Sequence, residues 1–408
     1  MTAVVVVAAS PGARAVICAA AVMRLLACPI VAALCAALLV LPGCRHMVRD
    51  QPLGEHVLPA QAADFVPDEQ RDAVLHYYGV GGWGILWKGE YLMTAPYFSN
   101  HGLLASSTCE ARPDEDAIAH GFAETPYRAT KVILVGHGHV DHAADIPAYP
   151  LAQMDRPTMI ADQSTLNLLG NAVRGQVCAI PLPAAVPGPL PTDGDCSTGA
   201  FRITPLPWAH APHAGLESVG LYATFGAPQG AQSTPLCEPP KTGNGWLVGR
   251  TWAFLIELLD GERTVFRILY VDSAASPAFV APWPPLEDDP IDVHIACMPD
   301  FDLVTGYPFD LVRDRNVKYV LAGHWEDFFR PRDRSVRPVA VLSEHEMNEF
   351  VLQVEQAIGQ PTEEHGPVNK TDCTVGKTCG PHGSTWTVPT PGETFRFRTS
   401  ASPDTASP

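Results

Sequence analysis

Basic residues are scarce in this chain, and nowhere do they form a run. Lysine and arginine together number 27 against 44 acidic residues in a chain of 408, which leaves a formal charge of −17. A protein that holds nucleic acid needs cations along the phosphate backbone. The composition therefore argues against a nuclease, and no nucleic-acid partner is expected.

Charge is absent from one long segment near the start. From Leu25 to Gly43 there is no charged residue, Arg24 stands just before, and the segment leads into Cys44. This pattern resembles a bacterial lipoprotein signal over residues 1–43, with Cys44 as the lipidated first residue of the mature protein. A transmembrane anchor of similar length is the alternative. Either reading predicts export, with the true start at Met23 and a lipid-anchored protein on the periplasmic side of the cell envelope.

The remainder divides by composition into a tether, one large domain and an extension. Residues 44–68 are weakly patterned and are expected to form the tether. Residues 69–359 alternate apolar strand runs with helical patterns such as 163–173 and 344–358, which predicts a single α/β catalytic domain. With 46% hydrophobic residues the chain can bury a large core. Residues 360–408 are expected to be an extension with a disordered end.

Cysteine pairing follows from the expected oxidising compartment. Seven cysteines lie downstream of Cys44, an odd number, so at least one is unpaired. Cys373 and Cys379 enclose a short loop and are the preferred bridge, with Cys178 and Cys196 as the second choice.

Four metal-binding side chains lie within six residues, directly after the apolar run 131–135: His137, His139, Asp141 and His142. In an extended stretch side chains two apart point the same way, so His137 and His139 can hold one ion together. The chain then turns, and Asp141 and His142 can face a second ion. A solvated polar turn is the alternative, and the pattern favours a metal site.

Further ligand-type residues follow three later strands. A histidine after the strand near 199–206 is either His210 or His213, and His210 is favoured because it lies nearer the strand end. Asp272 follows the strand 265–271, whose preceding Asp260-Gly261 predicts a hairpin with 251–259. His324 follows the buried run 317–323.

The His-x-His-x-Asp-His segment resembles the signature of the metallo-β-lactamase superfamily, and the later residues follow in that family's order. The resemblance implies a four-layer αββα sandwich with a dinuclear zinc site at one edge, Mn²⁺ or Fe²⁺ being other possible occupants. It implies that His137, His139 and His210 hold the first ion and that Asp141, His142 and His324 hold the second. Asp272 would bridge the two ions, and Asp141 and Asp272 are the expected catalytic carboxylates. Water activated by the ions would be the nucleophile.

The details of the resemblance favour a hydrolase. Redox members carry acidic replacements within the first motif, whereas this chain has histidines throughout. Ala95 stands before Pro96 where many relatives place an aspartate, which weakens the case for a β-lactamase. A phosphodiester, a lactone or another ester or amide of a small or lipid-like molecule is the expected substrate. A non-catalytic metal-binding envelope lipoprotein and a β-lactamase are the alternatives.

Other segments are expected to support the site. Asp145, Glu326 or Asp327 could orient ligand imidazoles. Two loops rich in proline and glycine, 181–194 and 227–245, are expected to shape substrate access. Four tryptophans near the motifs, which either line a pocket or pack in the core, are Trp208, Trp246, Trp252 and Trp325.

Overall fold

The structure is a computed structural model, and its secondary structure is described for most of the chain after residue 70. The described residues are 55–57, 71–102, 112–123, 125–182, 188–190, 192, 194–212, 228–279, 283, 290–332, 334, 336–339, 342, 344–359 and 385–400. Among them no helix combines the length and apolar character needed to cross a membrane. The expected signal segment and Cys44 lie outside the described residues.

The larger of two sheets has eight strands in the order β1-β14-β2-β3-β4-β5-β6-β7. Neighbours from β4 to β7 run parallel, whereas β14, β2, β3 and β4 pair antiparallel. The strands are β1 (Glu55–Val57), β2 (Asp72–Gly79), β3 (Gly82–Trp87), β4 (Glu90–Met93), β5 (Thr130–Leu134), β6 (Thr158–Asp162), β7 (Cys178–Leu182) and β14 (Thr394–Arg398).

The smaller sheet has six strands in the order β13-β12-β11-β10-β9-β8. Its strands are β8 (Phe201–Trp208), β9 (Thr251–Asp260), β10 (Arg263–Val271), β11 (Val293–Cys297), β12 (Tyr319–Gly323) and β13 (Trp386–Thr387). The hairpin expected at Asp260-Gly261 is confirmed, since β9 and β10 pair antiparallel across it. Gly261 adopts a φ of 62°, which favours glycine over other residues.

The two sheets bury an apolar layer between them. Successive side chains of a strand point to opposite faces, and β5 shows the consequence: Val132 and Leu134 lie in the layer between the sheets, while Ile133 packs on the opposite face. In β12 Leu321 joins the same inner layer, whereas Val320 faces outward. Both faces of each central strand are thus buried.

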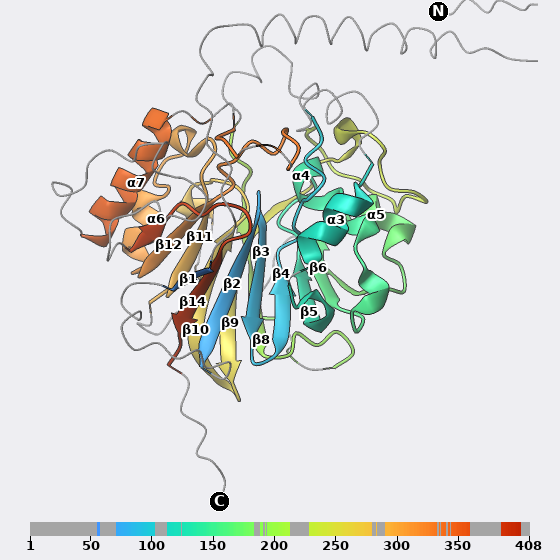
Figure 1. The fold of residues 1–408 in the computed structure, drawn as a ribbon, viewed down its shortest axis with the longest axis horizontal. Helices are drawn as coiled ribbons and strands as arrows, with labels where there is room; N and C mark the ends of the chain where they lie inside the picture. The colour runs from blue at the N-terminus through green and yellow to red at the C-terminus, as the bar shows by residue number, and fades with distance from the viewer. Residues whose placement is uncertain are drawn as a thin grey trace, which may run out of the picture. The chain divides into compact units, whose positions relative to one another are not determined.

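Helices cover the outer faces and complete four layers (Figure 1). Ile118 and Phe122 of α3 pack on the outer face of the larger sheet, and Leu311 of α6 and Phe350 of α7 pack on that of the smaller. The αββα sandwich implied by the resemblance is therefore confirmed. The helices are α3 (Glu115–Phe122), α4 (Val140–Ala143), α5 (Gln163–Leu169), α6 (Phe309–Asp314) and α7 (Glu344–Ile358).

Most expected elements form, with small changes at their ends. The helix expected over 163–173 stops at Leu169, because Gly170 takes a φ of 49° and a single 3₁₀ turn follows. The 3₁₀ segments are η2 (Tyr127–Ala129), η3 (Ile146–Ala148), η4 (Leu151–Gln153), η5 (Gly170–Ala172), η7 (Gly243–Gly245), η8 (Pro277–Phe279) and η9 (Phe301–Leu303).

Strands from both ends of the chain join the sheets beyond the expected domain limits. Strand β14 pairs with β2 and with β1, which lies in the segment expected to be a tether. Strand β13 pairs with β12 at the edge of the smaller sheet. Residues 385–400, expected to be part of the extension, therefore add one strand to each sheet.

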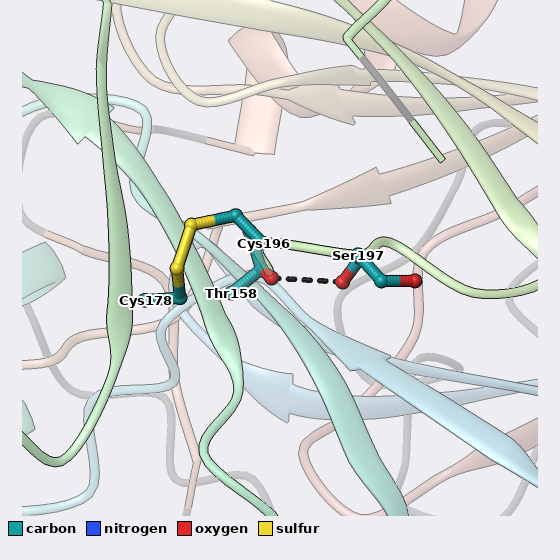
Figure 2. Close-up of a disulfide and its surroundings, with 4 residues drawn as sticks. All are labelled: Thr158, Cys178, Cys196 and Ser197. Carbon is teal, nitrogen blue, oxygen red and sulfur yellow. Dashed lines mark hydrogen bonds between the residues drawn. A yellow bond between two sulfur atoms is a disulfide. The ribbon is translucent and has the colours of Figure 1, made fainter. Parts of the chain in front are cut away.

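A disulfide joins Cys178, at the start of β7, to Cys196 in the segment that leads to β8 (Figure 2). Beside it the Thr158 hydroxyl donates to the carbonyl oxygen of Ser197 over 2.8 Å. The second-choice pair is thus formed, whereas the preferred pair Cys373 and Cys379 lies outside the described residues. Cys237 is exposed and unpaired.

Removing this disulfide should destabilise the folded protein, because the unfolded chain gains conformational entropy without the bridge. The bridge spans 18 residues, and a loop of that size corresponds to about 3 kcal/mol of unfolding free energy. Urea unfolding of the double variant Cys178→Ser, Cys196→Ser should show a loss of that order, with Cys237→Ser as the control. Equal stabilities of the double variant and the control would contradict the prediction.

The buried His294, in β11, should make the folded protein less stable in acid. It is fully buried, its Nδ1 lies 3.0 Å from the carbonyl oxygen of Leu269, and burial lowers its pKa to about 4. Above pH 6.5 the ring is neutral in both folded and unfolded chains. As the pH falls from 6.5 to 4, only the unfolded chain takes up the proton, so stability is lost across that window.

This histidine can change the unfolding free energy by at most about 1.4 kcal/mol per pH unit. Replacing it by His294→Asn, which keeps a donor for Leu269, should flatten the dependence of unfolding free energy on pH between 6.5 and 4. Denaturant titrations at several pH values measure this slope. Parallel curves for the two proteins would exclude the contribution.

Candidate metal centre

The side chains expected as metal ligands lie together at one edge of the sandwich, each just beyond the end of a strand or in the first turn of a helix. They form three overlapping groups in which the ligand atoms lie within 4.8 Å of one another. The groups are His137 with His139 and His210; His137 with His142 and Asp272; and Asp141 with His142 and His324.

The turn after β5 depends on glycines that let other segments approach the backbone. A Cβ on Gly136 would overlap the Asp272 carboxylate, and one on Gly138 would overlap the carbonyl oxygen of Leu247. Backbone hydrogen bonds hold the turn to β9 and the segment just before it. The amide of Gly138 donates to the carbonyl oxygen of Val248 over 2.9 Å, and the amide of Trp252 donates to the carbonyl oxygen of Gly136 over 2.8 Å. The histidine turn is thereby locked against the smaller sheet.

The first group is made of three imidazoles. The ring centroids of His137 and His139 lie 4.7 Å apart, and His210 lies 4.9 Å from His137 and 4.7 Å from His139. His137 and His139 are buried and His210 is half-buried. His210, favoured by the sequence, is therefore in this group, while His213 lies outside the described residues.

The second group combines one carboxylate with two imidazoles. Oδ2 of Asp141 lies 3.4 Å from Nε2 of His142 and 3.4 Å from Nε2 of His324, and the two nitrogens lie 3.1 Å apart. Helix α4 presents Asp141 and His142 as consecutive residues of its first turn. Three donor atoms therefore converge on one small volume.

Asp272 lies between the two groups, 2% exposed. Its Oδ2 is 2.8 Å from Nδ1 of His137, and its Oδ1 is 2.9 Å from Nδ1 of His142. The hydroxyl of Tyr270 also contacts Oδ1. The carboxylate is thus within the cluster, as expected, and its role as a bridging ligand stays a prediction.

The buried carboxylates are held ionised by the histidines around them. Burial alone would raise the pKa of Asp141 and Asp272, but His142 and neighbouring imidazoles outweigh it and lower both. Burial opposes protonation of His142, yet Asp272 and Asp141 raise its pKa to about 9. The pocket of negative charge so formed favours any cation that fits.

The backbone at His324 is held in a strained conformation. Its φ is 61°, in the left-handed region that non-glycine residues seldom adopt. The His324 amide donates to the hydroxyl of Tyr77 over 2.9 Å, and that hydroxyl donates to Oε2 of Glu326 over 2.6 Å. Oε1 of Glu326 accepts from the amide of Val80, another buried residue with positive φ, 55°. One phenol–carboxylate pair therefore stabilises two strained positions.

The carboxylates proposed to orient imidazoles act elsewhere. Asp145 accepts from the amides of Phe98 and Ser99, at 2.6 and 2.9 Å. Asp327 pairs with Arg337 at 2.6 Å. Glu326 supports the His324 backbone and not its ring. Within the described residues, the carboxylate that contacts the Nδ1 atoms of ligand histidines is Asp272.

A cavity of about 400 Å³ adjoins His210. Its lining includes Trp208, Trp252, Gln229 and Arg250, so the loop that contains Gln229 borders the site, as expected. Trp208 and Trp252 thus meet both expectations, being buried and lining the cavity. Trp246 and Trp325 pack in apolar clusters.

Sequence reasoning overlooked several residues that complete the site. Tyr77, Tyr270 and Arg250 carry no motif, and each acts through contacts between segments distant in the chain. Gly81 is a further such residue, since a Cβ there would lie 2.5 Å from Oδ1 of Asp272. The glycine-rich stretch before β3 was the one available signal.

The donor set fits divalent metal ions. Nε2 of His137 and Nδ1 of His324 are buried without a hydrogen-bond partner among the described residues. Buried polar nitrogens left unpaired are costly, and a cation held by His137 would relieve the cost there. Imidazole and carboxylate ligands suit zinc and similar ions. The His and Asp groups could therefore hold metal.

Comparisons with known proteins give likenesses of structure only. No protein-family model matches the chain, and no curated protein matches it. Among solved structures it is similar to Igni18, a metallo hydrolase from Ignicoccus hospitalis, at 14% identity and a TM-score of 0.42, covering 80% of this chain and 99% of that one.

Two further solved structures resemble the chain with similar sequence identity and TM-score. An isothiocyanate hydrolase from Delia radicum gut bacteria is 12% identical with a TM-score of 0.40, over 80% of this chain and 99% of that one. CmlA, a diiron β-hydroxylase from Streptomyces venezuelae, is 14% identical with a TM-score of 0.41, over 72% and 52%. At such values these likenesses say nothing of this chain's substrate or reaction, and the fold rests on the sheets and helices described above.

Removing the Tyr77 hydroxyl should weaken the second group. The variant Tyr77→Phe leaves the His324 amide without its acceptor, which corresponds to about 1–3 kcal/mol for a buried group. We expect lower unfolding free energy and lower zinc affinity, measured by denaturant titration and calorimetry.

The matched control is Tyr307→Phe. The Tyr307 hydroxyl likewise accepts a hydrogen bond from a buried amide and donates one to a carbonyl oxygen, both belonging to Cys297 at 2.9 Å. Among the described residues Cys297 is not one of the candidate metal ligands. This control should lose stability and keep zinc affinity. If both variants bind zinc equally well, Tyr77 has no role in positioning His324.

Proposed function

We propose that this chain is an exported metal-dependent hydrolase of the metallo-β-lactamase superfamily that acts on a phosphodiester. The single observation that carries the proposal is the convergence of four strand ends on two sets of ligand atoms, with the Asp272 carboxylate between them. Each set offers three protein ligands, the number that leaves a position open for water in catalytic zinc sites, whereas structural sites are closed by four.

The proposed ligands follow the two groups. His137, His139 and His210 would hold one ion, and Asp141, His142 and His324 the other, with zinc favoured and Mn²⁺ or Fe²⁺ as other candidates. When bound, such ions activate water as a nucleophile near neutral pH and stabilise negative charge on a substrate oxygen.

The chain's own residues would bind and orient the substrate. The cavity is lined by His210 of the first group, and Trp208 and Trp252 are among its other lining residues. Aromatic walls reduce the water around a bound ester and hold its apolar part. The scissile bond would then lie next to the ligand histidines.

Arg250 favours a phosphodiester over a lactone. It is an exposed cation in the lining of this cavity, in a chain whose formal charge is −17. A guanidinium matches two phosphate oxygens with parallel hydrogen bonds, whereas a neutral lactone offers no charge for it to bind. The positive charge beside His210 therefore supports an anionic substrate, with a lipid head group as one candidate.

Export and anchoring belong to the same proposal. The bridge between Cys178 and Cys196 supports an oxidising compartment, since cytosolic proteins rarely keep disulfides. The charge-free segment before Cys44 is the proposed lipoprotein signal, which would tether the enzyme to the membrane on the periplasmic side. Mass analysis of the protein from membranes would reveal a lipid on Cys44.

The activity is tested with zinc-loaded full-length protein in detergent and a panel of chromogenic substrates. We expect turnover of bis(4-nitrophenyl) phosphate, and loss of turnover in His142→Ala. A neutral ester, a lactone and a chromogenic cephalosporin are the competing substrates. If no substrate is turned over with zinc, manganese or iron, the hydrolase proposal fails, and exclusive turnover of the cephalosporin would indicate a β-lactamase.

The role of Arg250 is tested by the charge dependence of KM. The variant Arg250→Ala should raise KM for the anionic phosphodiester about 10-fold, a loss of about 1.4 kcal/mol, with little change for a neutral ester. Arg313→Ala, which removes an exposed arginine from α6, is the control. Equal effects of Arg250→Ala on both substrates would exclude the anion contact.

A further inference from the structure

We infer that Asp272 orients one imidazole of each ion group by accepting a hydrogen bond from its Nδ1, and that it does not bridge the ions. The inference rests on the proposed metal site and specifies how that site is held. It departs from the bridging role that the sequence resemblance implies.

Both oxygens of Asp272 are already engaged by donors. Oδ2 lies 2.8 Å from Nδ1 of His137, and Oδ1 lies 2.9 Å from Nδ1 of His142. The hydroxyl of Tyr270 contacts Oδ1 as well. The Asp272 side chain is 1% exposed, so water cannot replace these donors. To bridge two ions, the carboxylate would have to turn away from them.

The contacts select the tautomer that metal binding needs. An imidazole whose Nδ1 proton is held by a carboxylate binds a cation through Nε2, and any proton on Nε2 leaves when the cation binds. Nε2 of His142 faces Oδ2 of Asp141 and Nε2 of His324, the other donors of the second group. Nε2 of His137 is buried without a hydrogen-bond partner among the described residues. A single carboxylate thus directs one lone pair to each group.

The surrounding backbone leaves the carboxylate little freedom to move. A Cβ on Gly81 would lie 2.5 Å from Oδ1 of Asp272 and 2.8 Å from Nδ1 of His142. A Cβ on Gly136 would overlap the same carboxylate from another segment. Two glycines therefore bring backbone close to Asp272, one near each of its oxygens, and this close packing holds the carboxylate on the ring nitrogens.

The arrangement is one that metal proteins use widely. A carboxylate that accepts from the far nitrogen of a ligand histidine fixes the ring and increases its basicity. Here one residue would serve two histidines that belong to different ions. Asp272 is thus a positioning residue shared by both ions, and Tyr270 positions Asp272 in turn.

A crystal structure of the full-length protein loaded with zinc tests the inference directly. We expect each Asp272 oxygen to stay within about 3 Å of its Nδ1 partner, a hydrogen-bond distance. An Asp272 oxygen at about 2.0–2.2 Å from zinc, the length of a coordination bond, would overturn the inference while leaving the hydrolase proposal intact.

Zinc stoichiometry provides a second test, with Asp141→Asn as the matched control. Asp272→Asn should still bind two ions at saturating zinc, with affinity lowered about 10- to 100-fold. Asp141→Asn, which removes a proposed direct ligand, should bind one. A limit of one ion in Asp272→Asn would overturn the positioning role. If wild-type protein binds neither zinc, manganese nor iron, the proposed function fails as well, so the two failures are distinguishable.

Discussion

Polar groups from four distant parts of the chain meet at one edge because two apolar sheet faces are pressed against each other. Residues such as Leu134, Ile268 and Leu321 from both sheets share one buried layer, and apolar burial of this extent is the main source of stability in a domain of this size. Strand register then determines where each strand ends. A shift of one residue in β10 or β12 would turn its apolar side chains out of this layer.

The same packing creates an electrostatic problem at the edge. Asp141, Asp272 and His142 are buried among imidazoles, and burial opposes each of their charged forms. Mutual attraction lowers the pKa of the two carboxylates and raises that of His142. Such a cluster is tolerable because its members pair with one another, and a cation shared among them would complete the pairing. Local strain at Val80 and His324 is concentrated at the same edge.

Much of this arrangement could be predicted along the chain. The hairpin at Asp260-Gly261, helix α7 and the placement of His137, His210 and His324 at strand ends all followed from local patterns of apolar residues, turns and ligand types. These features are encoded by neighbouring residues, because hydrophobic periodicity and turn preference act over short stretches. The strands of residues 385–400 could not be foreseen in this way, since β14 pairs with β1 and β2 from the start of the domain and β13 pairs with β12 of the smaller sheet.

The residue sequence thus determined which side chains were available as ligands and which strands would present them. Tertiary structure decided how they are oriented. Whether Asp272 faces an ion or the Nδ1 of a histidine depends on Tyr270, Gly81 and Gly136, and whether His324 points inward depends on Tyr77 and Glu326. These contacts join segments up to 249 residues apart, and no local pattern encodes a hydrogen bond between such segments, because its geometry exists only once the sheets have packed.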